Sequence, residues 1–152
     1  MPISLPVLPE RLKDTIAMSR ATRCDQGEPT VTSTILIVLA GLMGAGGVIL
    51  AAASAHARPG AGLDSAAYML LFHAAAVLGG AALVRQGQLW WPLALVGLVG
   101  WVLGGALFSG DITLRAFAGH RLFAMAAPIG GTILIAAWLA FTAAAIFALV
   151  RS

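Results

Sequence analysis

The sequence has few charged residues. Only 10% of its 152 residues are charged, whereas 60% are hydrophobic; soluble domains carry about 25% charged residues. A soluble protein of this size could not bury so much apolar surface, so the excess must face lipid. A single cysteine, Cys24, excludes an internal disulfide and a cysteine-rich metal site. The scattered lysines and arginines suit membrane topology and predict no nucleic-acid partner.

Four long apolar stretches predict four transmembrane helices, at about residues 31–53, 63–84, 90–110 and 128–150. Each is close to the roughly 20 residues that cross a hydrocarbon core of about 30 Å. Their continuous apolar character excludes the alternating pattern of a β-barrel. We therefore expect an all-α integral membrane four-helix bundle over residues 31–152, after a cytoplasmic extension of residues 1–30.

The extension has a composition of its own and predicts a short interfacial helix. Pro9 and Glu10 suit the start of such a helix. Its apolar side chains recur every three or four residues and would share one face that docks on a partner; they are Leu5, Leu8, Leu12 and Ile16. A frayed tail is the alternative, and the pattern does not separate the two.

The distribution of arginine and lysine predicts the orientation. Six of these residues fall on the side of the chain termini and three on the other side. Because cytoplasmic segments carry the excess of positive charge, we expect both termini in the cytoplasm. The lipid bilayer is then the first partner of the chain.

Each predicted span contains a pair of adjacent glycines. Small residues let helix backbones approach closely in lipid, so the pairs predict helix-packing contacts. We interpret them as the seam inside the bundle, with a homo-oligomer interface as the alternative. The candidate packing residues are Gly46, Gly47, Gly79, Gly80, Gly100, Gly104, Gly130 and Gly131.

A few polar residues in or near the spans are candidates for a site, because ionisable groups at membrane depth are costly and often functional. They are His56, Tyr68, His73, Ser109 and Asp111. Two interpretations are open: a proton-handling or ligand-binding site, and a polar clamp that fixes helix register, which we favour. Two histidines that ligate haem must lie at one depth. The histidines here do not, so we expect no haem and no other cofactor.

The third span has two possible ends. It either stops near Phe108, with an outer connection from Asp111 to Ala127, or it continues to about Ala118 with Asp111 on its inner face. The sequence does not decide between them.

Several short motifs follow one another along the chain: Ala55-His56, Phe72-His73-Ala74, Gly105 to Gly110, Ala127 to Gly131, and Trp138. In their order and spacing they resemble the small bacterial inner-membrane proteins grouped as domain of unknown function 423. The chain departs from the usual pattern at Ala51–Ser54 and at Asp111–Thr113. The resemblance implies a four-helix inner-membrane fold and no particular activity.

No catalytic motif is present: the sequence contains no HExxH, GxSxG or P-loop pattern, so we expect no enzyme. The leading hypothesis is an accessory subunit that packs against a larger membrane complex, such as a respiratory or photosynthetic one. The second is an oligomeric transporter or channel subunit that uses His73 and the outer polar residues. The third is a redox module that binds quinone or haem.

Overall fold

The computed structural model describes residue 9, residue 11 and residues 31–151. The predicted interfacial helix therefore lies outside the described residues, and Cys24 does too. The apolar residues of that helix are Leu5, Leu8, Leu12 and Ile16.

Residues 31–151 form four helices joined by short connections: α2 (Val31–His56), α3 (Leu63–Arg85), α4 (Trp91–Ala118) and α5 (Ala126–Arg151). Each has 23 to 28 residues and is long and apolar enough to cross a membrane. No strand occurs in this described segment. The predicted all-α membrane four-helix fold is confirmed.

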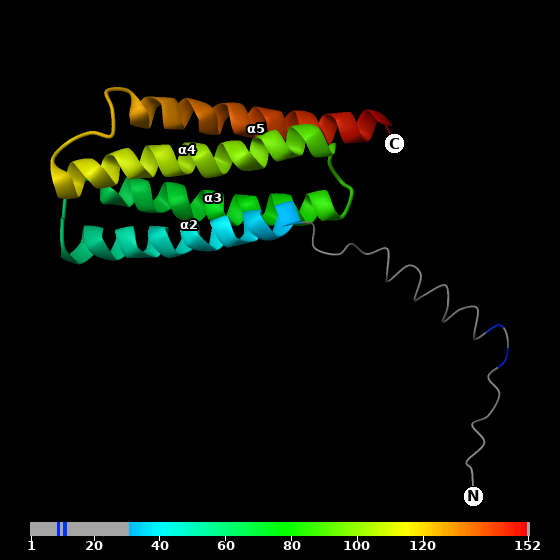
Figure 1. The fold of residues 1–152 in the computed structure, drawn as a ribbon, viewed down its shortest axis with the longest axis horizontal. Helices are drawn as coiled ribbons and strands as arrows, with labels where there is room; N and C mark the ends of the chain where they lie inside the picture. Colours follow the sequence, from blue (N-terminus) through cyan, green and yellow to red (C-terminus); the bar gives the residue numbers. More distant parts are fainter. Residues whose placement is uncertain (1–8, 10, 12–30, 152) are drawn as a thin grey trace, which may run out of the picture. The chain divides into compact units, whose positions relative to one another are not determined.

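The helices lie side by side in the order of the sequence and alternate in direction (Figure 1). Helix α4 contacts α2, α3 and α5, whereas the Cα traces of α2 and α5 do not come within 8 Å of each other. The main core is shared by all four helices, with Leu36 and Ala40 from α2, Val77 from α3, Trp101 from α4 and Leu134 from α5.

Glycine and proline set the helix ends. Gly62 precedes α3 with φ 76°, and Gly119 ends α4 with φ 73°. Both angles lie in the left-handed region that favours glycine. Helix α4 thus continues to Ala118, so the shorter expected span that ends at residue 110 is wrong. Gly110 did not end the helix because it lies in an open helical interior position, where glycine costs only about 1 kcal/mol.

Helices α4 and α5 meet through a seam of small residues. A Cβ atom added to Gly104 would lie 2.9 Å from the carbonyl oxygen of Gly130, and one added to Gly100 would lie 2.7 Å from Ala137 Cβ. Gly130 faces the α4 backbone in turn, since a Cβ added there would lie 2.7 Å from the nitrogen of Phe108 and 2.9 Å from the carbonyl oxygen of Gly104. The two backbones therefore touch with almost no side chain between them.

The remaining glycines of the four pairs divide between contacts and open positions. Added Cβ atoms would lie 2.6 Å from Leu71 at Gly47, 3.4 Å from Leu70 at Gly46, and 2.7 Å from Leu98 at Gly80. Nothing lies within 4 Å of such an atom at Gly79 or at Gly131. Most of the predicted packing glycines therefore contact a neighbouring helix of the same chain. For the alternative interpretation, a homo-oligomer interface, only Gly79 and Gly131 of the four pairs are open to a second copy of the chain.

A second contact between α4 and α5 lies at the N-terminal end of α4. The Trp90 backbone nitrogen donates to the Ala144 carbonyl oxygen at 3.1 Å. The Trp90 ring lies 5.3 Å from the Phe147 ring, and the Arg151 guanidinium lies over it at 5.2 Å. An indole and an arginine at the ends of membrane helices suit the interface with the headgroups.

We expect Gly130→Ala to destabilise the fold and Gly131→Ala to leave it unchanged. The added methyl group at Gly130 meets backbone atoms that cannot rotate away, whereas the neighbouring position is open. Overpacking of this kind costs about 1–3 kcal/mol. Thermal aggregation of the purified proteins in mild detergent measures the difference. Equal melting curves for the two variants would contradict the close α4–α5 seam.

Candidate functional site

His73 lies on α3 and is almost fully buried among α3, α4 and α5. Its Nδ1 atom is 2.8 Å from the Met69 carbonyl oxygen, one turn earlier in the helix. Since a carbonyl only accepts, Nδ1 carries the proton. The other nitrogen, Nε2, accepts a hydrogen bond from Trp138 Nε1 at 3.3 Å. Both ring nitrogens are thus occupied, and the ring is a neutral imidazole that links α3 to α5.

Aromatic rings surround this histidine. Trp138 lies 5.9 Å from Phe72 and 4.4 Å from Trp101, measured between ring centroids. Phe141 extends the group on α5, 4.7 Å from Trp101. Trp101 is 1% exposed, and its Nε1 has no hydrogen-bond partner among the residues that the structure describes. The group extends from the buried Trp101 to the exposed rings of Trp138 and Phe72, and a hydrogen bond links Trp138 to His73.

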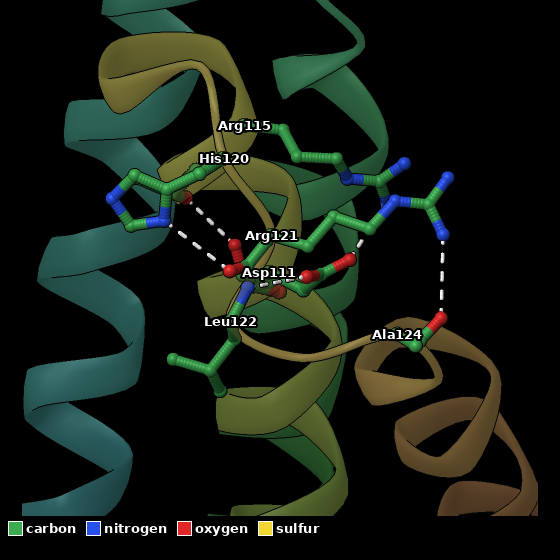
Figure 2. A network of polar contacts seen from close by, with 8 residues as sticks. Asp111, Arg115, His120, Arg121, Leu122 and Ala124 are labelled. Carbon is green, nitrogen blue, oxygen red and sulfur yellow. Dashed lines mark hydrogen bonds and ion pairs between the residues drawn. The ribbon is translucent and has the colours of Figure 1, made fainter.

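Asp111 forms a second polar site, at the far end of α4 (Figure 2). The residue is 2% exposed. Its Oδ1 accepts from the Leu122 backbone nitrogen at 2.9 Å, and its Oδ2 pairs with Arg115 Nη2 at 2.9 Å. Arg115 lies one turn later on α4 and is 40% exposed. The carboxylate therefore holds the connection from α4 to α5 against the end of α4.

Ser109 joins α4 to α3. Its hydroxyl donates to the Ala66 carbonyl oxygen at 3.0 Å. The Ser109 carbonyl oxygen in turn accepts from the Thr113 hydroxyl at 2.7 Å. These bonds satisfy the buried hydroxyl within the chain, as membrane helices require.

The five predicted site residues do not form one cluster. No hydrogen bond or ion pair joins any two of them, although all five lie in the described segment. Ser109 lies opposite Ala66, so His73 is about 10 Å further along α3 at a rise of 1.5 Å per residue. His56 and Tyr68 are exposed at the bundle surface. The partners of Asp111 lie outside this set and are Arg115 and the Leu122 backbone nitrogen.

The sequence analysis missed the partners of both polar sites. The spacing of four between Asp111 and Arg115 is a visible signal for a helical ion pair. No comparable signal links His73 to Trp138, because the two are 65 positions apart. In the described part of the chain, no group of three or more His, Cys, Asp or Glu residues is placed to hold a metal ion.

The four apolar helices define a multi-pass membrane protein. Residues 43–131 match the family described as a protein of unknown function (DUF423), and the chain belongs to this family. The resemblance seen in the sequence is thereby confirmed. The matched segment includes His73 and Asp111 and ends before Trp138. No curated protein and no solved structure matches the chain.

We expect Asp111→Ala to loosen the connection between α4 and α5. The change removes the acceptor of the Leu122 nitrogen and the partner of Arg115. A lost buried acceptor costs about 1–3 kcal/mol, so trypsin should cleave after Arg121 about tenfold faster. Asp64→Ala is the matched control, since Asp64 is an exposed carboxylate at the same end of the bundle. Equal cleavage rates for both variants would show that Asp111 does not hold the connection.

Proposed function

We propose that this protein is a non-catalytic accessory subunit that packs against a larger membrane protein complex. Its site of action is the bacterial inner membrane, with both termini in the cytoplasm, and a respiratory or photosynthetic complex is the kind of partner that we have in mind. The observation that carries the proposal is a pair of exposed aromatic rings, Phe72 and Trp138, at the middle of the membrane-spanning helices.

The polar groups of the spans support a structural role. His73 uses both ring nitrogens, Ser109 binds α3 backbone, and Asp111 uses both carboxylate oxygens. A catalytic group must form a bond with a substrate, and His73 would first have to break one of the two bonds that its ring nitrogens make. Polar bonds between membrane helices stabilise helix association, which is the role that this arrangement favours.

The aromatic pair supports contact with another membrane helix. Phe72 is 60% exposed and Trp138 38% exposed, although both lie near the middle of their helices. Tryptophan in membrane proteins usually lies at the headgroup level. The bond from Trp138 to His73 fixes the orientation of this ring at its unusual depth. Rigid aromatic side chains are enriched where proteins bind each other.

A transporter or channel subunit is the second candidate function. The observation in its favour is the burial of His73 near the middle of α3, where a group that handles protons or ions would lie. This function requires several copies of the chain, because four spans do not enclose a path alone. It also requires the His73 ring to leave Trp138 during each cycle.

A photo-crosslinking residue at Phe72 should capture a partner protein, whereas the same residue at Ile35 should not. Ile35 is a matched control because it is exposed to a similar degree, at 52%, on α2. The complex is extracted in mild detergent through a C-terminal tag, and the crosslinked products are identified by mass spectrometry. Equal crosslinking at both positions, or recovery of the chain without a stable partner, would contradict the accessory role.

His73→Ala separates the two candidate functions. An accessory subunit should still assemble with its partner, at a stability lower by about 1–3 kcal/mol because the Trp138 N–H loses its acceptor. A transporter should lose flux in proteoliposomes while its oligomer stays intact. Recovery of a homo-oligomer alone, together with loss of flux in this variant, would replace the first proposal by the second.

A further inference from the structure

Two arginine side chains belong to the polar network around Asp111, at the end of α4. Arg115 is in the last turns of α4, and Arg121 is in the connection to α5. In Figure 2 both side chains extend past Asp111 towards the start of α5. Arg121 Nη1 donates to the Ala124 carbonyl oxygen at 3.3 Å, which directs its guanidinium to that side.

The charges in this group do not cancel. Asp111 balances one of the two arginines, and its second oxygen is already used by the Leu122 nitrogen. Arg121 has no carboxylate partner within the described residues, and its one bond is to a neutral carbonyl. Asp64, the other acidic residue within residues 31–151, makes no ion pair with either arginine there. The group therefore carries one uncompensated positive charge and several free N–H donors, because each guanidinium has five.

The residues beside Arg121 place this charge at the membrane surface. Leu122 is 49% exposed, and Phe123 and Met125 are exposed to a similar extent. Apolar side chains in a connection between two membrane helices insert into the boundary between headgroups and hydrocarbon. Arginine at such a depth extends its guanidinium to the headgroup phosphates. The arginines and the apolar side chains thus match the two parts of one lipid molecule.

We propose that Arg115 and Arg121 form a binding site for the headgroup phosphate of an anionic phospholipid. A guanidinium donates two parallel N–H bonds to phosphate oxygens, and two guanidiniums around one phosphate leave no charge on it unpaired. Asp111 orients Arg115 through their ion pair, so the site is preorganised by the same carboxylate that holds the connection. Leu122 and Phe123 contact the acyl chains of the bound lipid.

The test uses the full chain purified in mild detergent, with lipid binding followed by native mass spectrometry and by thermal shift. The probes are phosphatidylglycerol, phosphatidylcholine and glycerol 3-phosphate. We expect phosphatidylglycerol to bind more tightly than phosphatidylcholine, whose choline carries a cation near the arginines. Glycerol 3-phosphate should give no stabilisation at the same concentration, because it lacks the acyl chains.

Arg121→Gln should weaken phosphatidylglycerol binding about tenfold, as expected for the loss of one charge-assisted contact. Arg121→Lys keeps the positive charge but lacks the planar guanidinium. Its affinity for phosphatidylglycerol should lie between that of the unchanged protein and that of Arg121→Gln. Arg58→Gln is the matched control, since Arg58 is exposed at the same end but lies over the Phe117 ring, outside the pair. Melting without added lipid checks that each variant is folded.

Three results would overturn the proposal. Equal weakening by Arg58→Gln and Arg121→Gln would indicate diffuse attraction of anionic lipid to this end of the protein. Stabilisation by glycerol 3-phosphate to the same extent would make the ligand a free phosphate group. Equal binding of phosphatidylglycerol and phosphatidylcholine would show that the uncompensated charge does not select a lipid.

Discussion

The backbone contact between α4 and α5 is the constraint on which the rest of the structure depends. Gly104 and Gly130 meet so closely that neither position has room for a Cβ atom. This approach brings Trp101 of α4 against Trp138 of α5, and Trp138 in turn reaches His73 on α3. In lipid, where apolar surface gains little by leaving the solvent, such close packing is a main source of helix association.

Polar bonds then fix what the small-residue packing leaves free. Packing between smooth apolar helices tolerates sliding along their axes, whereas a bond to one particular backbone atom does not. Ser109 sets the register of α4 against α3, and His73 sets that of α5 against α3. Asp111 holds the connection between α4 and α5 through its bond from the Leu122 backbone nitrogen and its ion pair with Arg115. Each helix pair in the second half of the chain therefore has a packing contact and a directional bond.

The sequence predicted the fold well because the membrane imposes one solution on long apolar stretches. It also indicated that the glycine pairs are helix-packing positions, though not which member of each pair faces a neighbouring helix. Gly130 and Gly131 illustrate the limit: they are adjacent, yet a rotation of 100° about the helix axis separates a backbone contact from open space. Of the candidate polar residues, His73, Ser109 and Asp111 are buried in the bundle.

The partners of these residues could not be predicted, since depth estimated from position in a span has an error of several residues. Ser109 lies at the level of Ala66 on α3, and His73 is seven residues further along that helix, which is enough to keep the two polar side chains apart. Trp138 drew no attention as a hydrogen-bond donor, because tryptophan in an apolar run is normally interpreted as packing. The mid-membrane exposure of Phe72 depends on how the neighbouring helices pack around α3, which is a property of the assembled bundle alone.

The order of the helices has a consequence for biogenesis. Each helix packs against the one made just before it, and the Cα traces of α2 and α5 do not come within 8 Å of each other in the described structure. Helices α2 and α3 can therefore pair as soon as both have left the translocon, and α4 can add to that hairpin while α5 is still being synthesised. The bond between His73 and Trp138 is available only after α5 has entered the membrane. It is therefore a late step in the assembly of the bundle.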